Sequence, residues 1–145
     1  MSAPTFDQIQ AFAVRWYRKL DEHAPVQDLA LLLAGDDFEL RVPEGSFHGV
    51  AGFSQWYERA LGLFFDETHT VKSVEAAPGE TPESTVGVVV RWEASTWTPP
   101  EAKSRRIVAD ARQTWTVRLS ASTGGLEILS YTVDRIEYAH GSARL

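Results

Sequence analysis

Three side chains in this sequence have the chemistry for moving a proton: the imidazole of His69 and the phenols of Tyr17 and Tyr131. A histidine that faces an apolar pocket favours its neutral ring, which accepts a proton near neutral pH. A buried phenol needs a hydrogen-bond partner and can donate to an oxygen on which negative charge develops. His69 is therefore a candidate general base, with Tyr17 or Tyr131 as the polarising group. The alternative is a structural histidine bonded to a backbone carbonyl.

His48 is a weaker candidate, because it directly precedes Gly49 and suits a turn position that holds local backbone groups. The two histidines show none of the close spacings, such as H-x-H or H-E-x-x-H, that are typical of metal sites, and the chain has no cysteine. We therefore expect no bound metal. We also expect no cofactor, because the sequence shows no nucleotide-binding motif.

Asp110 and Arg112 allow two interpretations, because they share one face of an expected strand with Thr114. If this face looks inward, the pair is able to orient an acidic or carbonyl ligand. If the opposite, apolar face looks inward, the polar set is exposed or faces a dimer partner. Alternation favours the second interpretation, since this apolar row includes Ile107, Ala111 and Trp115.

The chain is rich in aromatic residues, with five Trp, four Tyr and seven Phe. Such side chains offer rigid surface to cores, pockets and interfaces alike. Helix stripes must first fill the interior, because protein cores are densely packed. We predict that a set of them also lines a pocket for a small apolar or aromatic molecule: Trp16, Phe38, Phe53, Trp56, Tyr57, Trp92 and Trp115.

The elements that position these residues follow from the spacing of the apolar side chains. Ile9, Ala13, Trp16 and Leu20 recur every three or four residues, which indicates one face of a helix with Thr5 as its cap. Two more helices are expected over 26–33 and 53–64, strands over 38–42, 46–48, 67–76, 85–98, 106–121 and 126–138, and turns at 77–83 and 122–125.

Helices gathered early, with long strands later, predict an α+β fold in which the helices cover one face of a curved antiparallel sheet. Long bulged strands curl, so the covered face becomes concave. A concave face lined by aromatic residues is a candidate ligand site.

The 145 residues predict a single domain, 1–145, that buries a core without disulfide bonds. The formal charge of −6 opposes the electrostatics of nucleic-acid binding. No apolar run approaches the ~18 residues of a membrane span, and the first residues lack the basic and then apolar order of a signal peptide. We expect a cytoplasmic protein that binds neither nucleic acid nor membrane.

Several short motifs accompany this order of elements: F-x-L-x-V-P from Phe38, F-H-G from Phe47, F-x-x-W-Y from Phe53, H-x-V from His69, V-x-W from Val90 and I-L-S-Y-T-V-D from Ile128. Together they resemble the nuclear transport factor 2-like superfamily, most of all its SnoaL-like proteins, which include polyketide cyclases. The resemblance covers nearly the whole chain. It implies a cone-shaped α+β barrel with an internal pocket, three N-terminal helices over the sheet, and often a homodimer formed through the outer face of the sheet.

The resemblance also implies a range of activities, because the superfamily includes isomerases, dehydratases, cyclases and non-catalytic modules. Catalytic members place an Asp or His inside the cone, and His69 matches a His often found at the start of the first long strand. Asp134 corresponds to an acidic residue near the end of the last strand, but its alternation with Tyr131 and Val133 argues against an inward position.

These observations predict a cofactor-independent isomerase, cyclase or dehydratase that transfers protons on a cyclic or polyketide-like molecule. The alternative is a non-catalytic ligand-binding or dimerisation module of the same fold.

Overall fold

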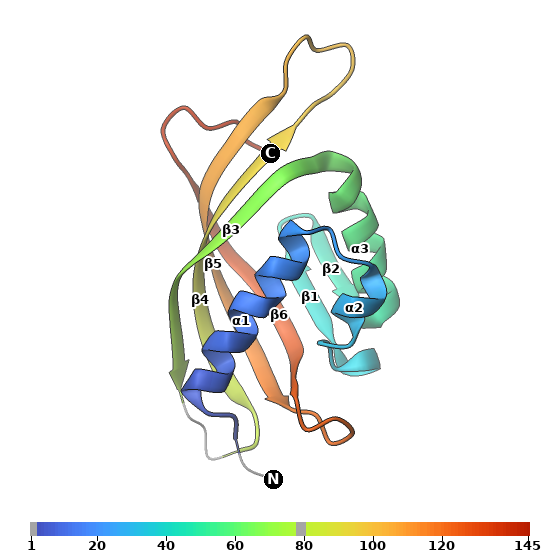
Figure 1. Ribbon diagram of the computed structural model, residues 1–145, viewed down its shortest axis with the longest axis vertical. Helices are drawn as coiled ribbons and strands as arrows, with labels where there is room; N and C mark the ends of the chain where they lie inside the picture. Colours follow the sequence, from blue (N-terminus) through green and yellow to red (C-terminus); the bar gives the residue numbers. More distant parts are fainter. Residues whose placement is uncertain (1–2, 78–80) are drawn as a thin grey trace.

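The computed structural model describes residues 3–77 and 81–145, so residues 78–80 of the predicted turn lie outside the described residues. Three helices come early in the chain and the long strands follow (Figure 1). The elements are α1 (Phe6–Asp21), α2 (Val26–Ala30), the 3-10 turn η1 (Gly35–Asp37), β1 (Glu39–Val42), β2 (Gly45–His48), α3 (Gly49–Leu63), β3 (Phe64–Ala77), β4 (Ser84–Thr96), β5 (Arg105–Leu119) and β6 (Leu126–Tyr138).

Helix α1 begins at the cap predicted from the sequence. The Thr5 hydroxyl accepts a hydrogen bond from the Gln8 backbone N–H, and the Gln8 side chain accepts one from the Thr5 N–H. This reciprocal arrangement satisfies two backbone donors at the start of the helix. The buried face of α1 is the apolar stripe expected from its spacing, including Ile9, Trp16 and Leu20.

The strands form one six-stranded sheet in the order β2-β1-β6-β5-β4-β3. Four of the neighbouring pairs are antiparallel, but β1 and β6 run parallel, with Leu40 opposite Tyr131. The sheet is therefore mixed, whereas the sequence predicted antiparallel pairing throughout. Parallel pairing needs a long connection, and here α3 and several strands separate β1 from β6. The sheet stays open, because β2 and β3 form its two edges.

Helix α2 ends at Ala30, earlier than the predicted range of 26–33. After the helix, the chain pairs with β6: the Leu32 carbonyl accepts from the Ile128 N–H, and the Ala34 N–H donates to the Ile128 carbonyl. These bonds take the place of further helical ones. Leu33 stays buried, as the apolar pattern required.

Helix α1 lies across the concave face of the sheet (Figure 1), where its apolar stripe packs against the inward side chains of the strands. The predicted α+β class, with helices over one face of a curved sheet, is confirmed. No helix in residues 3–77 and 81–145 is long and apolar enough to cross a membrane.

The opposite face of the sheet carries ion pairs. Asp110 accepts hydrogen bonds from Lys72 at 3.0 Å and Arg91 at 3.1 Å, which hold the pKa of its carboxyl below the usual value. Arg112 donates to Glu137 at 2.8 Å. Since Ile107, Ala111 and Trp115 are buried on the inward side, the second interpretation of Asp110 and Arg112 is confirmed. Asp134 also lies outside the cone, where its exposed carboxylate accepts from Thr114.

Two bulges in β3 decide which of its side chains face the cone. Phe65 pairs with Ser95 and Thr68 pairs with Glu93, so one extra residue lies between them, at Asp66. Asp66 has a left-handed φ of 50°. A bulge of this kind shifts the alternation of the strand, so that Phe64, Glu67 and His69 all line the cavity inside the cone. A second register shift between Val71 and Ser73 restores the original phase.

Candidate active site inside the cone

A cavity of about 570 Å³ lies between the concave face of the sheet and helix α3. Its wall is mostly apolar, and Glu67, His69 and Gln113 bring polar groups into it from β3 and β5. A largely apolar pocket with a few fixed polar groups is typical of small-molecule sites. The aromatic part of the wall consists of Trp56, Tyr57, Phe64, Trp92, Tyr131 and Tyr138.

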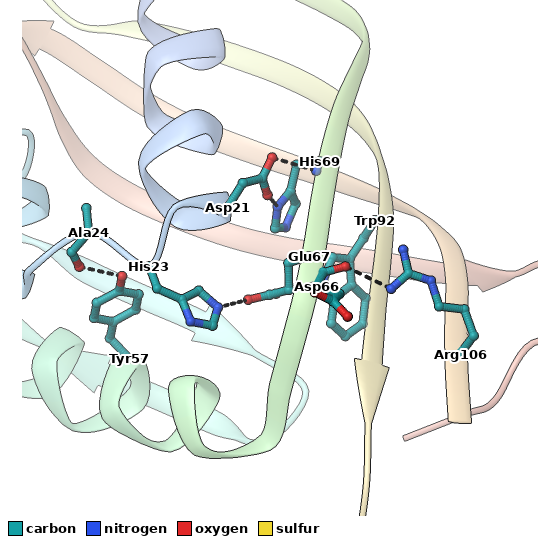
Figure 2. A network of polar contacts seen from close by, with 9 residues as sticks. All are labelled: Asp21, His23, Ala24, Tyr57, Asp66, Glu67, His69, Trp92 and Arg106. Atoms are coloured by element: carbon teal, nitrogen blue, oxygen red, sulfur yellow. Dashed lines mark hydrogen bonds and ion pairs between the residues drawn. The ribbon is translucent and has the colours of Figure 1, made fainter. Parts of the chain in front are cut away.

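His69 is clamped by Asp21 at both its backbone and its ring (Figure 2). Asp21 Oδ1 lies 2.6 Å from His69 Nδ1, and Oδ2 accepts the His69 backbone N–H at 2.9 Å. Because a carboxylate only accepts, Nδ1 carries a hydrogen, and in the neutral ring the lone pair is then on Nε2. The His69 side chain is 12% exposed and lines the cavity. This arrangement suits a general base whose protonated form is stabilised by the carboxylate.

Asp21 was not predicted from the sequence, although the chain carries a signal for it. It is the last residue of α1, where the helix dipole disfavours a negative charge. A residue that is unfavourable for its own helix often makes a contact elsewhere in the fold. Here the contact is with His69, 48 positions later. Nothing in the sequence pattern identifies His69 as the partner of Asp21.

Tyr17 connects His69 to a second polar group of the wall. Its ring stacks on the His69 ring, with centroids 4.9 Å apart, and its hydroxyl donates to Gln113 Oε1 at 2.6 Å. Trp115 Nε1, which is only a donor, also binds Gln113 Oε1. The amide N–H groups of Gln113 are thus the donors that it can offer to Tyr131 or to a ligand. Gln113 was also missed, although it is a polar residue in an apolar alternating row.

Tyr131 lines the cavity, whereas Tyr17 is enclosed behind it. Their hydroxyl oxygens are 3.3 Å apart, which is long for an O–H···O bond. Burial and the neighbouring Tyr131 raise the pKa of Tyr17 well above its usual value, and burial also raises the pKa of Tyr131. Both phenols therefore keep their protons and act as donors.

The aromatic residues predicted for the pocket divide into two groups. Trp56, Tyr57 and Trp92 line the cavity. The others are fully buried among the helices and the sheet, away from the cavity lining: Trp16, Phe38, Phe53 and Trp115. His48, the second histidine, is exposed and directly precedes α3.

A second carboxylate–imidazole pair joins the turn after α1 to β3 (Figure 2). His23, just after α1, lies 2.7 Å from Glu67 on β3, and Trp92 donates to the other oxygen of Glu67 at 3.1 Å. Within residues 3–77 and 81–145, no three His, Asp or Glu side chains gather closely enough to hold a metal ion.

The sequence matches no protein-family model and no curated protein. Solved structures do match. A scytalone dehydratase-like protein of Novosphingobium aromaticivorans has a TM-score of 0.73 and 16% identity, covering 95% of this chain and 88% of that one. The hexachlorocyclohexane dehydrochlorinase LinA type 2 has a TM-score of 0.74 and 13% identity, covering 96% and 91%.

ActVI-ORFA of Streptomyces coelicolor has a TM-score of 0.66 and 15% identity, covering 93% of this chain and 97% of that one. At such identities the likeness shows the fold alone. The cone-shaped α+β fold that the sequence resemblance implied is thereby confirmed, and this chain shares that fold with these solved structures.

Proposed function

We propose that the protein is a cofactor-independent enzyme that removes a proton from a carbon acid, with His69 as the general base. The observation that carries this proposal is the clamp of Asp21 on His69 at the wall of an apolar cavity. Asp21 fixes the tautomer in which Nε2 accepts a proton, and it stabilises the imidazolium that forms.

The residues that line the cavity support a class of substrate. A cyclic, mostly apolar molecule matches the aromatic side chains and the volume of about 570 Å³. When His69 takes a proton from a carbon next to a carbonyl, the electron pair moves to the carbonyl oxygen. Tyr131 and the amide of Gln113 are the donors that meet this oxygen. Tyr17 supports both His69 and Gln113 from behind.

The resulting enolate has three outcomes. Its return of a proton at another carbon is an isomerisation, the loss of a leaving group from the next carbon is an elimination, and its attack on an electrophilic carbon is a cyclisation. Two of the similar structures are named for dehydration and dehydrochlorination. Both of these reactions take a proton from carbon, which supports elimination as the leading reaction class.

Deuterium exchange into 2-tetralone tests the proton-transfer step without the natural substrate. This bicyclic ketone has acidic C–H groups on both sides of its carbonyl, and proton NMR in D₂O follows their exchange. We expect the protein to accelerate exchange above the buffer rate, and we expect His69→Gln to abolish the acceleration.

His48→Gln is the matched control, because His48 is exposed and outside the cavity. It should exchange 2-tetralone as fast as the unchanged protein. Exchange by His69→Gln at the unchanged rate would remove His69 as the base. A protein that exchanges no faster than buffer would contradict proton abstraction from ketones of this kind.

A further inference from the structure

Glu67 brings a largely buried carboxylate into a mostly apolar cavity wall, whose other charged residues, Glu44 and Arg59, are exposed. Its side chain is 11% exposed, and it lines the same cavity as His69, two positions further along β3. A carboxylate removed from water is costly unless hydrogen bonds compensate it. The position of Glu67 on the inner wall therefore points to a role in the cavity.

Two fixed donors hold the carboxylate in place (Figure 2). His23 Nε2 lies 2.7 Å from Oε2, and Trp92 Nε1 donates to Oε1 at 3.1 Å. Two carboxylate oxygens have about four acceptor sites in total. The two donors occupy two of them, and acceptor capacity remains on a group that lines the cavity.

The backbone on both sides of this pair is strained. In the described part of the chain, His23 and Asp66 are the only residues other than glycine with positive φ, at 51° and 50°. His23 follows the C-cap of α1, where its N–H donates to Leu20 and the next N–H donates to Lys19. Glycine is the usual residue in this helix-ending conformation.

Asp66 forms the bulge that directly precedes Glu67. The two strained residues thus aim the two partners of a single pair, His23 and Glu67. A left-handed φ is unfavourable at residues that have a Cβ. Such strain gathers at functional sites, where the surrounding structure maintains it.

The surroundings of Glu67 favour a ligand group that donates hydrogens. Tyr57, beside Glu67 in the wall, gives its hydroxyl hydrogen to the Ala24 carbonyl at 2.6 Å. Burial, followed by the charge of Glu67, raises the pKa of Tyr57 to about 12. The phenol therefore stays neutral and protonated, and its hydrogen is directed away from Glu67. Among the charged residues of the lining, Glu67 is thus the one that is largely removed from solvent, and its charge acts on a ligand in the cavity.

We propose that Glu67 is the binding group for a hydrogen-bond donor, a hydroxyl or an ammonium, carried on the apolar ring frame of the substrate. Because this names the substrate class of the cavity described above, it rests on the proposed function. The cavity then holds a ligand at two points, with an acidic C–H at His69 and an O–H or N–H at Glu67.

Three probes with one carbon frame test this subsite: tetralin, 2-tetralol and 2-aminotetralin. Their dissociation constants are measured by calorimetry and tryptophan fluorescence for the unchanged protein and for Glu67→Gln. We expect Glu67→Gln to weaken 2-aminotetralin about 10-fold, because a charged acceptor is lost. Tetralin should bind both proteins equally.

The two polar probes show whether the subsite binds an ammonium group alone or a hydroxyl group as well. If only 2-aminotetralin weakens, the subsite takes a cation. If 2-tetralol weakens as well, by a smaller factor of about threefold, the subsite takes hydroxyl groups too. Glu75→Gln is the matched control, since Glu75 is an exposed residue of the same strand outside the cavity lining. It removes the same charge and should change no affinity.

A crystal structure of the unchanged protein with 2-aminotetralin supplies a second measurement that needs no variant. The nitrogen should lie within hydrogen-bond distance of a Glu67 oxygen. Unchanged affinities in Glu67→Gln for both polar probes, or a nitrogen placed away from Glu67, would overturn the proposal.

The dissociation constants are measured without any reaction, so the variant His69→Gln can test the Glu67 subsite independently of the proton transfer by His69. That variant should keep the response of the probes to Glu67→Gln, even though it loses deuterium exchange. If His69→Gln loses exchange but still binds the probes, only the role of His69 as base is affected. If Glu67→Gln weakens the polar probes but keeps exchange, only the Glu67 subsite is affected.

Discussion

Tyr17 stacks on His69 with their rings 24° from parallel, and the same phenol donates its hydrogen to Gln113. One buried residue of α1 thus supports two cavity groups that come from different strands. The ring and the hydroxyl contribute separately, so substitutions can separate them.

Tyr17→Phe removes the hydroxyl and keeps the stacked ring. Gln113 Oε1 then keeps only Trp115 as its donor, and we expect a loss of about 1–2 kcal/mol in the free energy of unfolding. Urea denaturation measures this loss. Tyr17→Leu, which removes the ring as well, should lose more, and equal losses in the two variants would contradict a separate role for the hydroxyl.

Alkaline pH should destabilise the protein through its buried phenols. The unfolded chain releases tyrosine protons near pH 10, whereas the folded chain keeps those of Tyr17 and Tyr131, because the pKa values of both are raised. Stability is therefore complete below about pH 10 and falls above it, by up to about 1.4 kcal/mol per pH unit for each retained proton. Urea denaturation at several pH values should show a shallower fall for Tyr17→Phe, and parallel curves would exclude this cause.

Asp21→Asn should impair proton transfer far more than folding. The amide no longer stabilises the imidazolium of His69, so we expect 2-tetralone exchange to fall about 100-fold or more. The unfavourable charge at the end of α1 is removed at the same time, which offsets part of the stability lost with the hydrogen bonds. Glu22→Gln changes a neighbouring carboxylate and should leave the exchange rate unaltered.

His23 can be replaced in a pair of variants that isolates its backbone conformation. His23→Gly and His23→Ala both remove the bond to Glu67, but only alanine has to adopt a φ of 51° with a Cβ. We expect the glycine variant to be more stable by about 1 kcal/mol. Equal midpoints in chemical denaturation would show that the turn relaxes when the side chain is lost.

Aromatic residues of the core and of the cavity lining should respond differently to substitution by alanine. Phe53 is fully buried, so Phe53→Ala should cost about 3–5 kcal/mol of stability. Trp56 is only partly buried and lines the cavity, so Trp56→Ala should cost less and should weaken tetralin binding. A larger stability loss for Trp56→Ala would contradict this assignment.

The sequence was sufficient for the fold class and for most element boundaries. Helical and strand periods identified α1 together with its Thr5 cap, and β6 matched its predicted range of 126–138. Parallel pairing of β1 with β6 is a long-range contact that leaves no trace in local alternation. The end of α2 was misjudged for the same reason, because a distant strand supplies the hydrogen bonds that stop it.

For the candidate site, patterning named His69, Tyr17 and Tyr131 but not the carboxylate and amide groups that contact them. Asp21, Gln113 and Glu67 are recognisable only when α1, β3 and β5 meet in space. The direction of Glu67 depends on an extra residue at Asp66, and strict alternation carries no information about such an insertion. Local signals existed, namely an acid at a helix end and a glutamine in an apolar row, but neither of them identifies the residue on the other side of the contact.

The bulges of β3 also decide where the length of this strand can change. Phe64 and His69 both face inward although an odd number of positions separates them, because the extra residue at Asp66 absorbs the mismatch. Deleting Asp66 restores plain alternation and leaves both on the inner side. The strand thus contains a point where its length can change by one residue while His69 stays opposite Asp21.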